Sequence, residues 1–170
     1  KNIGADGDAC LISTKSENLY IKLLSLRNLG AIKKHDHNLL GMNSRLDTIQ
    51  AAVLNRKLKL ILKINEKRRK IAKIYDDKLK EIRHIKITKT NPGSARHLYV
   101  IRTKHRDALI KHLQKNKISC QIHYPYSLNK LKPFKKLVKK NINLKNSESW
   151  AKECVSLPIH PKLHIDQAYL

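Results

Sequence analysis

The sequence predicts an α/β protein, and three observations support that class. Residues 96–103 and 118–125 are rich in β-branched and aromatic side chains, and a stretch of helical periodicity, residues 105–116, separates them. Between Gly41 and Pro92 there is no glycine or proline, and apolar residues recur at helical spacing. Apolar residues make up 41% of the 170 positions but aromatic ones only 5%. We therefore expect a small α/β subdomain with a mainly aliphatic core.

The first forty residues begin with a loop. Residues 1–8 carry the glycine and aspartate chemistry of a turn, yet no element precedes them, so we expect the chain to be a fragment. Residues 9–14 are predicted to form a short buried strand. A helix should follow, with Ser16 as its N-cap and Gly30 at its end. Residues 31–42 are predicted to be irregular.

Two helices are expected in the stretch without glycine or proline. The apolar stripe of Leu46, Ile49 and Val53 does not continue smoothly into the later stripe that includes Ile71. We therefore expect the two helices to meet within residues 62–65.

The last third of the chain is predicted to hold short elements. Residues 133–140 and 147–155 have the composition of short helices, the second burying Trp150 and Cys154. Prolines should keep residues 157–161 extended, and residues 164–170 resemble the first turns of a last helix.

The net charge of +24 permits a nucleic-acid-binding protein, but composition favours a simpler explanation. Lysine, isoleucine and asparagine, all with A/T-rich codons, supply 28, 19 and 13 residues, whereas arginine supplies only nine. A site for nucleic acid more often favours arginine, whose planar side chain pairs with phosphate and base edges. A solvated lysine surface is the favoured interpretation, and nucleic-acid binding stays open as an alternative.

Cysteine use and hydropathy indicate the cytoplasm. Cys10, Cys120 and Cys154 are odd in number and far apart, which is typical of a reducing compartment. No apolar run approaches the ~20 residues of a membrane span. His35 and His37 lack the paired spacing of a zinc site, so no metal is expected.

The pattern Ser44-Arg45-Leu46-Asp47 matches a capping box in front of an apolar stripe. It predicts that a helix starts at Ser44, with Asn43 and Arg45 beside its positive end. Such a helix start suits an anion such as phosphate. The alternative is that the box only caps the helix and that Arg45 is solvated.

Four stretches, taken together, resemble one protein family. GMNSRLDTIQAAVLNRKLK (41–59) is followed by INEKRRKIAKIYDDKLK (64–80), then by residues 97–125 and by SLPIHPKL (156–163). In order and spacing these are similar to the DegT/StrS family of nucleotide-sugar aminotransferases, over essentially all 170 residues. The chain departs from the family pattern at Ile64, where a tryptophan is usual, and at Ala9-Cys10, where a glycine-alanine pair is common.

The resemblance implies a fold-type-I transferase dependent on pyridoxal 5'-phosphate. Residues 1–62 would be the C-terminal part of the large cofactor-binding domain, and residues 63–170 the small α/β domain with a truncated last helix. The remaining cofactor ligands would lie in a missing first half, so this chain alone should be inactive. We also expect exposed apolar surface at residues 9–26.

The resemblance also implies roles for individual residues. Lys1 begins a stretch similar to the family's K-N-x-G-A-x-G-D, which makes it the Schiff-base lysine. Asn43 would bind the cofactor phosphate of a neighbouring subunit, assisted by Arg45. His123 and Tyr124 match the pair that lies over the keto-sugar in related sugar 3-aminotransferases. Asn129 stands where the family often has histidine, so the sugar is less well defined than the reaction.

The implied function is transamination of a nucleotide-linked keto-sugar, a dTDP- or UDP-keto-deoxyhexose, with glutamate as amino donor. It would serve amino-sugar and surface polysaccharide biosynthesis, in a homodimer that shares its active sites. The pattern leans toward a 3-keto sugar. A non-catalytic regulator or sensor with the same fold is the alternative that stays open.

Overall fold

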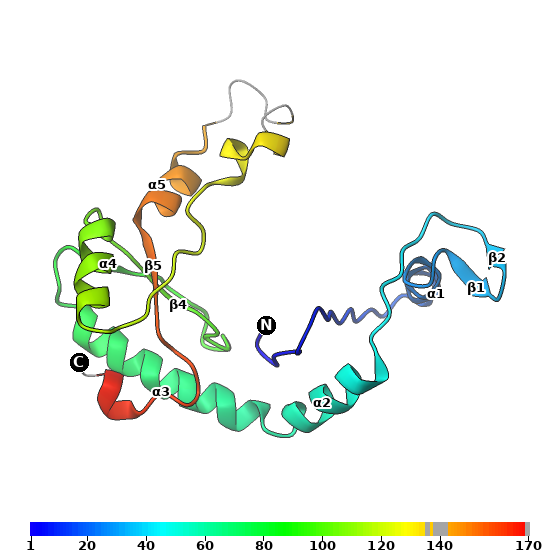
Figure 1. The fold of residues 1–170 in the computed structure, drawn as a ribbon, viewed down its shortest axis with the longest axis horizontal. Coiled ribbons are helices and arrows are strands. Elements are labelled where there is room, and N and C mark those ends of the chain that lie inside the picture. Colours follow the sequence, from blue (N-terminus) through cyan, green and yellow to red (C-terminus); the bar gives the residue numbers. More distant parts are fainter. Residues whose placement is uncertain (135–136, 138–142, 169–170) are drawn as a thin grey trace. The chain divides into compact units, whose positions relative to one another are not determined.

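The chain forms two compact units, Lys1–Ile61 and Leu62–Leu170, in the computed structural model (Figure 1). The structure describes residues 1–134, 137 and 143–168. Each unit has its own hydrogen-bonded elements.

The first unit contains two helices and a hairpin. These are α1 (Glu17–Leu26), β1 (Ala31–Lys33), β2 (Asp36–His37) and α2 (Thr48–Leu58). The Ser16 hydroxyl accepts a hydrogen bond from the backbone N–H of Leu19 at 3.3 Å, which confirms the predicted N-cap of α1. The antiparallel β1–β2 pair occupies a segment predicted to be irregular, so that prediction was wrong.

The strand predicted at residues 9–14 is not formed. Leu11 is 90% exposed and Ile12 is 68% exposed, and no described strand pairs with this segment. Since an extended segment needs a neighbour for its backbone groups, the apolar sequence alone does not make it a strand. The exposed apolar surface expected at residues 9–26 is confirmed; it consists of Leu11, Ile12, Leu19, Tyr20 and Ile21.

The second unit packs helices on a three-stranded antiparallel sheet of order β3-β4-β5. The strands are β3 (Lys86–Ile87), β4 (Tyr99–Arg102) and β5 (Cys154–Leu157). The helices are α3 (Ile61–Leu79), α4 (Arg106–Lys115) and α5 (Lys145–Glu153), and the short 3₁₀ helices are η1 (Leu128–Lys130), η2 (Lys132–Phe134) and η3 (Ile165–Ala168).

Several boundaries differ from the predictions. Helices α2 and α3 meet at residues 59–60, before the predicted 62–65. Residues 118–125 do not form a strand, because only Gln121 bridges to Ser156. Of the helix predicted at 133–140, the part at 135–136 and 138–140 lies outside the described residues. Cys154 is buried as predicted, but in β5 rather than in a helix.

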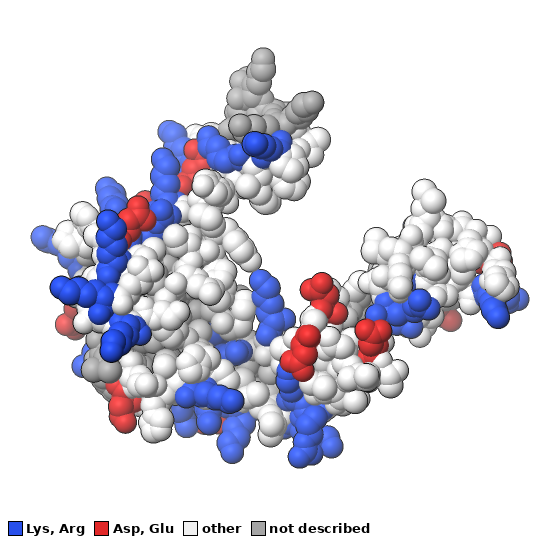
Figure 2. Space-filling view, in the orientation of Figure 1, with Lys and Arg blue, Asp and Glu red and all other residues white. Residues whose placement is uncertain are grey.

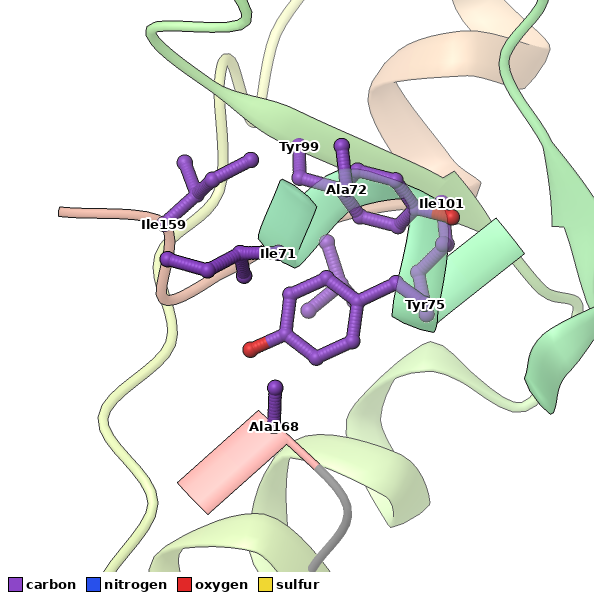
Figure 3. Close-up of a cluster of buried hydrophobic side chains, with 8 residues drawn as sticks. Ile71, Ala72, Tyr75, Tyr99, Ile101, Ile159 and Ala168 are labelled. Carbon is purple, nitrogen blue, oxygen red and sulfur yellow. The ribbon is translucent and has the colours of Figure 1, made fainter. Parts of the chain in front are cut away.

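The core of the second unit lies between α3 and the sheet (Figure 3). Ile71 and Tyr75 are one helical turn apart on α3 and therefore face the same way, toward Tyr99 and Ile101 of β4. The rings of Tyr75 and Tyr99 lie 4.9 Å apart at 54°. The buried cluster consists of Ile71, Ala72, Tyr75, Tyr99, Ile101, Val155, Ile159 and Ala168.

Both core tyrosines have partners for their hydroxyls. Tyr75 donates to the carbonyl oxygen of Pro158 at 2.8 Å, and Tyr99 donates to Oδ1 of Asp76 at 2.7 Å. Burial raises the pKa of Tyr99 far above its usual range, and the hydrogen bond to Asp76 raises it further. The tyrosines therefore tie α3 to the sheet as neutral donors.

Candidate functional site

The loop that carries Lys1 is held by one face of α2. Lys57 donates to the carbonyl oxygen of Gly4 and lies 2.9 Å from Oδ1 of Asp6. The backbone N–H of Asp6 donates to Oε1 of Gln50 at 3.1 Å. Gln50 and Lys57 are seven residues apart, about two helical turns, so they lie on the same face of α2. These contacts fix the backbone within a few residues of Lys1, whose side chain is exposed.

Two glycines allow the backbone of this loop to adopt its conformation. Gly4 has φ +81°, which suits glycine, and a Cβ on Gly7 would lie 2.6 Å from Nε2 of Gln50. The glycines that predict a turn therefore have two separate roles. Gly4 adopts a left-handed backbone conformation, and Gly7 lets the Gln50 side chain lie close to the backbone.

The predicted helix start at Ser44 is wrong. Helix α2 begins at Thr48 after Asp47, and the side chain of Asp47 makes no capping bond. The backbone N–H of Ser44 is occupied elsewhere, because it donates to the carbonyl oxygen of Arg27 at 2.9 Å. Asn43 and Arg45 therefore precede the helix by several residues and do not lie in its first turn.

Backbone hydrogen bonds pin the segment around Asn43 to the end of α1. Asn43 forms a bridge with Asn28, and the N–H of Met42 donates to the carbonyl oxygen of Leu26 at 2.8 Å. The approach requires glycine at two positions. A Cβ on Gly41 would lie 2.1 Å from the nitrogen of Gly30, and a Cβ on Gly30 would lie 1.6 Å from the carbonyl oxygen of Leu39. The segment is thus fixed at its backbone even though its side chains are exposed.

Asn43 and Arg45 contact each other. Nε of Arg45 donates to Oδ1 of Asn43 at 2.9 Å. This leaves Nδ2 of Asn43 and the terminal nitrogens of Arg45 without a partner among the described residues. All of these are donors, and two adjacent donor groups on a fixed backbone can bind an anion such as phosphate.

His123 and Tyr124 lie in the second unit, after α4. Nδ1 of His123 lies 2.8 Å from Oγ of Ser156, and Trp150 donates from Nε1 to the carbonyl oxygen of His123 at 3.3 Å. The two rings meet edge to face, 5.5 Å apart at 82°, and their peptide bond is cis. Tyr124 is 60% exposed. The pair therefore has one anchored ring and one ring open to solvent.

A cavity of about 970 Å³ in the second unit includes both His123 and Ser156 in its wall. Tyr75 of α3 and Cys120, which follows α4, also line it. Burial raises the pKa of the Cys120 thiol, so the thiol stays protonated near neutral pH. Cys120 is therefore not activated as a nucleophile in this wall.

Asn129 takes part in a polar cluster near η1. Its Nδ2 donates to Oε1 of Glu148 at 2.9 Å, and Lys130 pairs with the same oxygen at 3.2 Å. The hydrogen bond from Asn129 lowers the pKa of Glu148, as does the one from Lys130. Asn129 thus ties η1 to α5.

The structure brings some of the predicted site residues together. Asn43 and Arg45 contact each other in the first unit, and His123 and Tyr124 do so in the second. Sequence reasoning missed Gln50, Lys57 and Ser156. The spacing of Gln50 and Lys57 on α2 could have indicated a shared face, but nothing local links Ser156 to His123.

The described surface carries scattered basic side chains and no cluster of metal ligands. On the face in Figure 2, Lys and Arg are spread over many elements and do not form one stripe, which is typical of a solvated lysine surface. In the described residues no three His, Cys, Asp or Glu side chains gather as metal ligands would. None of the described helices combines the length and hydrophobicity that a membrane span needs.

The folded chain resembles solved sugar-aminotransferase structures. The crystal structure of DesV from S. venezuelae, in complex with a ketimine intermediate, superposes with a TM-score of 0.93 at 34% identity. The match covers 99% of this chain and 46% of DesV. The fold is that of the type-I pyridoxal-phosphate-dependent transferases, as the family resemblance implies.

Sequence comparison identifies the family. The DegT/DnrJ/EryC1/StrS aminotransferase family profile matches residues 1–169. A dTDP-3-amino-3,4,6-trideoxy-alpha-D-glucose transaminase of Streptomyces venezuelae is 35% identical over 170 residues, covering 99% of this chain and 45% of that protein. The erythromycin biosynthesis sensory transduction protein EryC1 of Saccharopolyspora erythraea is 36% identical, covering 99% and 46%. The chain belongs to the DegT/DnrJ/EryC1/StrS aminotransferase family, and it spans about half the length of these relatives.

Proposed function

We propose that this protein is an aminotransferase that uses pyridoxal 5'-phosphate to transfer an amino group from glutamate to a nucleotide-linked keto-sugar. The family match over residues 1–169 carries the proposal. A relative that is 35% identical is named as a transaminase of a dTDP-linked amino sugar, which supports the proposal. We favour a dTDP- or UDP-linked 3-keto sugar and a role in amino-sugar and surface polysaccharide biosynthesis.

Lys1 is the proposed attachment point of the cofactor. Its Nζ would hold the cofactor covalently and, once released by the incoming donor, accept the proton from Cα of that amino acid. The cofactor, when bound, supplies an electron sink for this proton transfer. Gln50 and Lys57, by fixing the loop at Gly4 and Asp6, would limit how far Lys1 can move from its working position.

Asn43 and Arg45 are the proposed ligands of the cofactor phosphate. Their donor atoms fit an anion, because Oδ1 of Asn43 is occupied by Arg45 and the remaining groups are donors. By the family pattern, the phosphate would belong to the neighbouring subunit of a homodimer, and each site would need both copies. The side chains are exposed, which is compatible with contact across such an interface.

His123 and Tyr124 are the proposed contacts to the sugar. Anchoring by Ser156 and Trp150 fixes the histidine, and the exposed tyrosine ring offers an apolar face with a hydroxyl at its tip. In this arrangement residues 1–62 belong to the large cofactor-binding domain and residues 63–170 to the small domain. Three free cysteines further support a cytoplasmic location.

The test uses the protein expressed from its complete reading frame. Incubation with pyridoxal 5'-phosphate should give the absorbance band of lysine-bound cofactor, and Lys1→Ala should abolish it. Lys15→Ala removes another exposed lysine of the same unit and should leave the band intact. An unchanged band in Lys1→Ala would overturn the assignment of Lys1, and no band in the unaltered protein would overturn the enzyme proposal.

A second candidate is a non-catalytic regulator with the same fold. The relative named as a sensory transduction protein is the observation that favours it. A regulator need not turn over substrate, so the two functions separate on one assay. Conversion of a nucleotide-linked keto-sugar to its amino sugar with glutamate supports the enzyme, whereas cofactor binding without turnover supports the regulator.

A further inference from the structure

The backbone of Ser156 is fixed by neighbouring segments on both sides. It pairs with Val100 of β4 in the register of the sheet. On its other side it exchanges two backbone hydrogen bonds with Gln121, at 3.2 and 2.7 Å. The residue is only 5% exposed. Its hydroxyl therefore occupies a defined place in the wall of the cavity.

The Ser156 hydroxyl and the His123 ring form one hydrogen bond whose direction can be inferred. Oγ of Ser156 lies 2.8 Å from Nδ1 of His123 and has no other hydrogen-bond partner among the described residues. If Nδ1 carried the proton and donated it, the hydroxyl proton would have no acceptor among the described residues, which is unfavourable for a side chain that is only 5% exposed. If the hydroxyl donates to Nδ1, its proton is satisfied. The second arrangement is therefore favoured.

We propose that Ser156 is a positioning residue that holds neutral His123 as the Nε2–H tautomer, so that the ring presents a hydrogen-bond donor to an oxygen of the sugar. A neutral imidazole has one donor and one acceptor nitrogen, and the partner of one decides the role of the other. In the described part of the chain, Nε2 of His123 has no hydrogen-bond partner. Contact with the sugar rests on the proposed function, whereas the tautomer does not.

The backbone of His123 is held by contacts that do not involve the Ser156 hydroxyl. Trp150 donates to its carbonyl oxygen at 3.3 Å, and the rings of His123 and Tyr124 meet edge to face. Removing the Ser156 hydroxyl should therefore leave the segment in place and release only the orientation and tautomer of the ring.

The first test measures the tautomer in the 170-residue chain by long-range ¹H–¹⁵N NMR of the histidine rings above their titration range. His123→Gln identifies the His123 signals among the nine histidines. We expect an unprotonated Nδ1 in the unaltered chain, exchange between both tautomers in Ser156→Ala, and restoration in Ser156→Thr, which retains a hydroxyl. Ser127→Ala is the matched control, because Ser127 is also buried but its hydroxyl has no hydrogen-bond partner among the described residues.

Two results would overturn the proposal. A protonated Nδ1 in the unaltered chain would do so whether or not any variant folds. The same would follow if Ser156→Ala kept the signals of the unaltered chain.

The second test separates this inference from the proposed function. In the protein expressed from its complete reading frame, Ser156→Ala should raise the KM for the nucleotide sugar about tenfold, the size of one lost hydrogen bond. The KM for glutamate should not change. Absence of transamination in the unaltered protein would contradict the proposed function while the NMR result still decides the tautomer. If Ser156→Ala left the KM for the sugar unchanged in an active enzyme, the proposed role of His123 as a hydrogen-bond donor to the sugar would be wrong.

Discussion

The two units of the chain differ in how far they bury their apolar side chains. The second unit encloses a cluster of eight buried residues between α3 and the sheet. In the first unit the described buried residues are Ser25, Gly30 and Ala31, while Leu11, Leu40 and Ile49 are at least 80% exposed. Exposed apolar surface on this scale is typical of an interaction surface. The second unit is therefore stabilised by its own core, whereas the first unit depends mainly on hydrogen bonds and close backbone approaches.

The largest effect on stability should come from the core of the second unit. Ile71→Ala removes a side chain that is 1% exposed, and we expect it to lower the free energy of unfolding by about 2–5 kcal/mol. Leu11→Ala, at a 90% exposed position of the first unit, should change it by less than about 0.5 kcal/mol. Urea denaturation followed by Trp150 fluorescence measures this, because Trp150 is the only tryptophan and lies in the second unit. Equal effects of the two substitutions would contradict the conclusion that the apolar core lies in the second unit.

A smaller effect is expected from the hydrogen bond of Tyr99. Tyr99→Phe keeps the ring packed on Tyr75 but removes the donor to Asp76, and Arg96 still lies 3.4 Å from that carboxylate. We expect a loss of about 1 kcal/mol by the same denaturation measurement. Tyr20→Phe, at an exposed position of the first unit, is the control and should be neutral. A loss as large as that of Ile71→Ala would mean that the polar contact, and not the apolar core, dominates.

The smallest effect concerns the ion pair between Arg102 and Glu153. The hydrogen bond from Ser149 lowers the pKa of Glu153 below its ordinary 4.5, and Arg102, at 2.7 Å, lowers it further. A carboxylate whose pKa is lower in the folded state stabilises that state above pH 4.5, and the contribution disappears as the pH falls through the folded value.

Glu153→Gln tests this contribution. It should lower the free energy of unfolding at pH 7 by less than about 1 kcal/mol, because the pair is partly exposed. The difference from the unaltered chain should shrink as the pH is lowered below 4.5. A difference that grows in acid would contradict the assigned direction of the pKa.

The sequence correctly predicted elements that depend on residues close to one another in the chain. The Ser16 cap of α1, the strand at β4 and the helix α4 follow from composition and periodicity, and the structure confirms them. The hairpin β1–β2 was missed because its turn has no glycine and uses His35 at φ 66° instead. Ser44 begins a capping pattern, but its backbone N–H donates to the carbonyl oxygen of Arg27. Arg27 is 17 residues earlier in the chain, so the local sequence around Ser44 does not indicate this hydrogen bond.

The candidate site was predictable mainly through family resemblance. Lys1 is one of 28 lysines, and nothing in its local sequence marks it as reactive. The local pattern places Asn43 and Arg45 beside a helix start at Ser44, whereas α2 begins at Thr48. Ser156 could not be found at all, because it is 33 positions from His123 and meets it only through the pairing of Gln121 with β5.

The attachment of the cofactor to Lys1 is tested most directly by chemical trapping. The protein expressed from its complete reading frame would be loaded with pyridoxal 5'-phosphate, reduced with borohydride, digested and mapped by mass spectrometry. We predict that the cofactor mass is found on the peptide that contains Lys1. Cofactor found on a peptide from any other part of the protein would contradict the assignment.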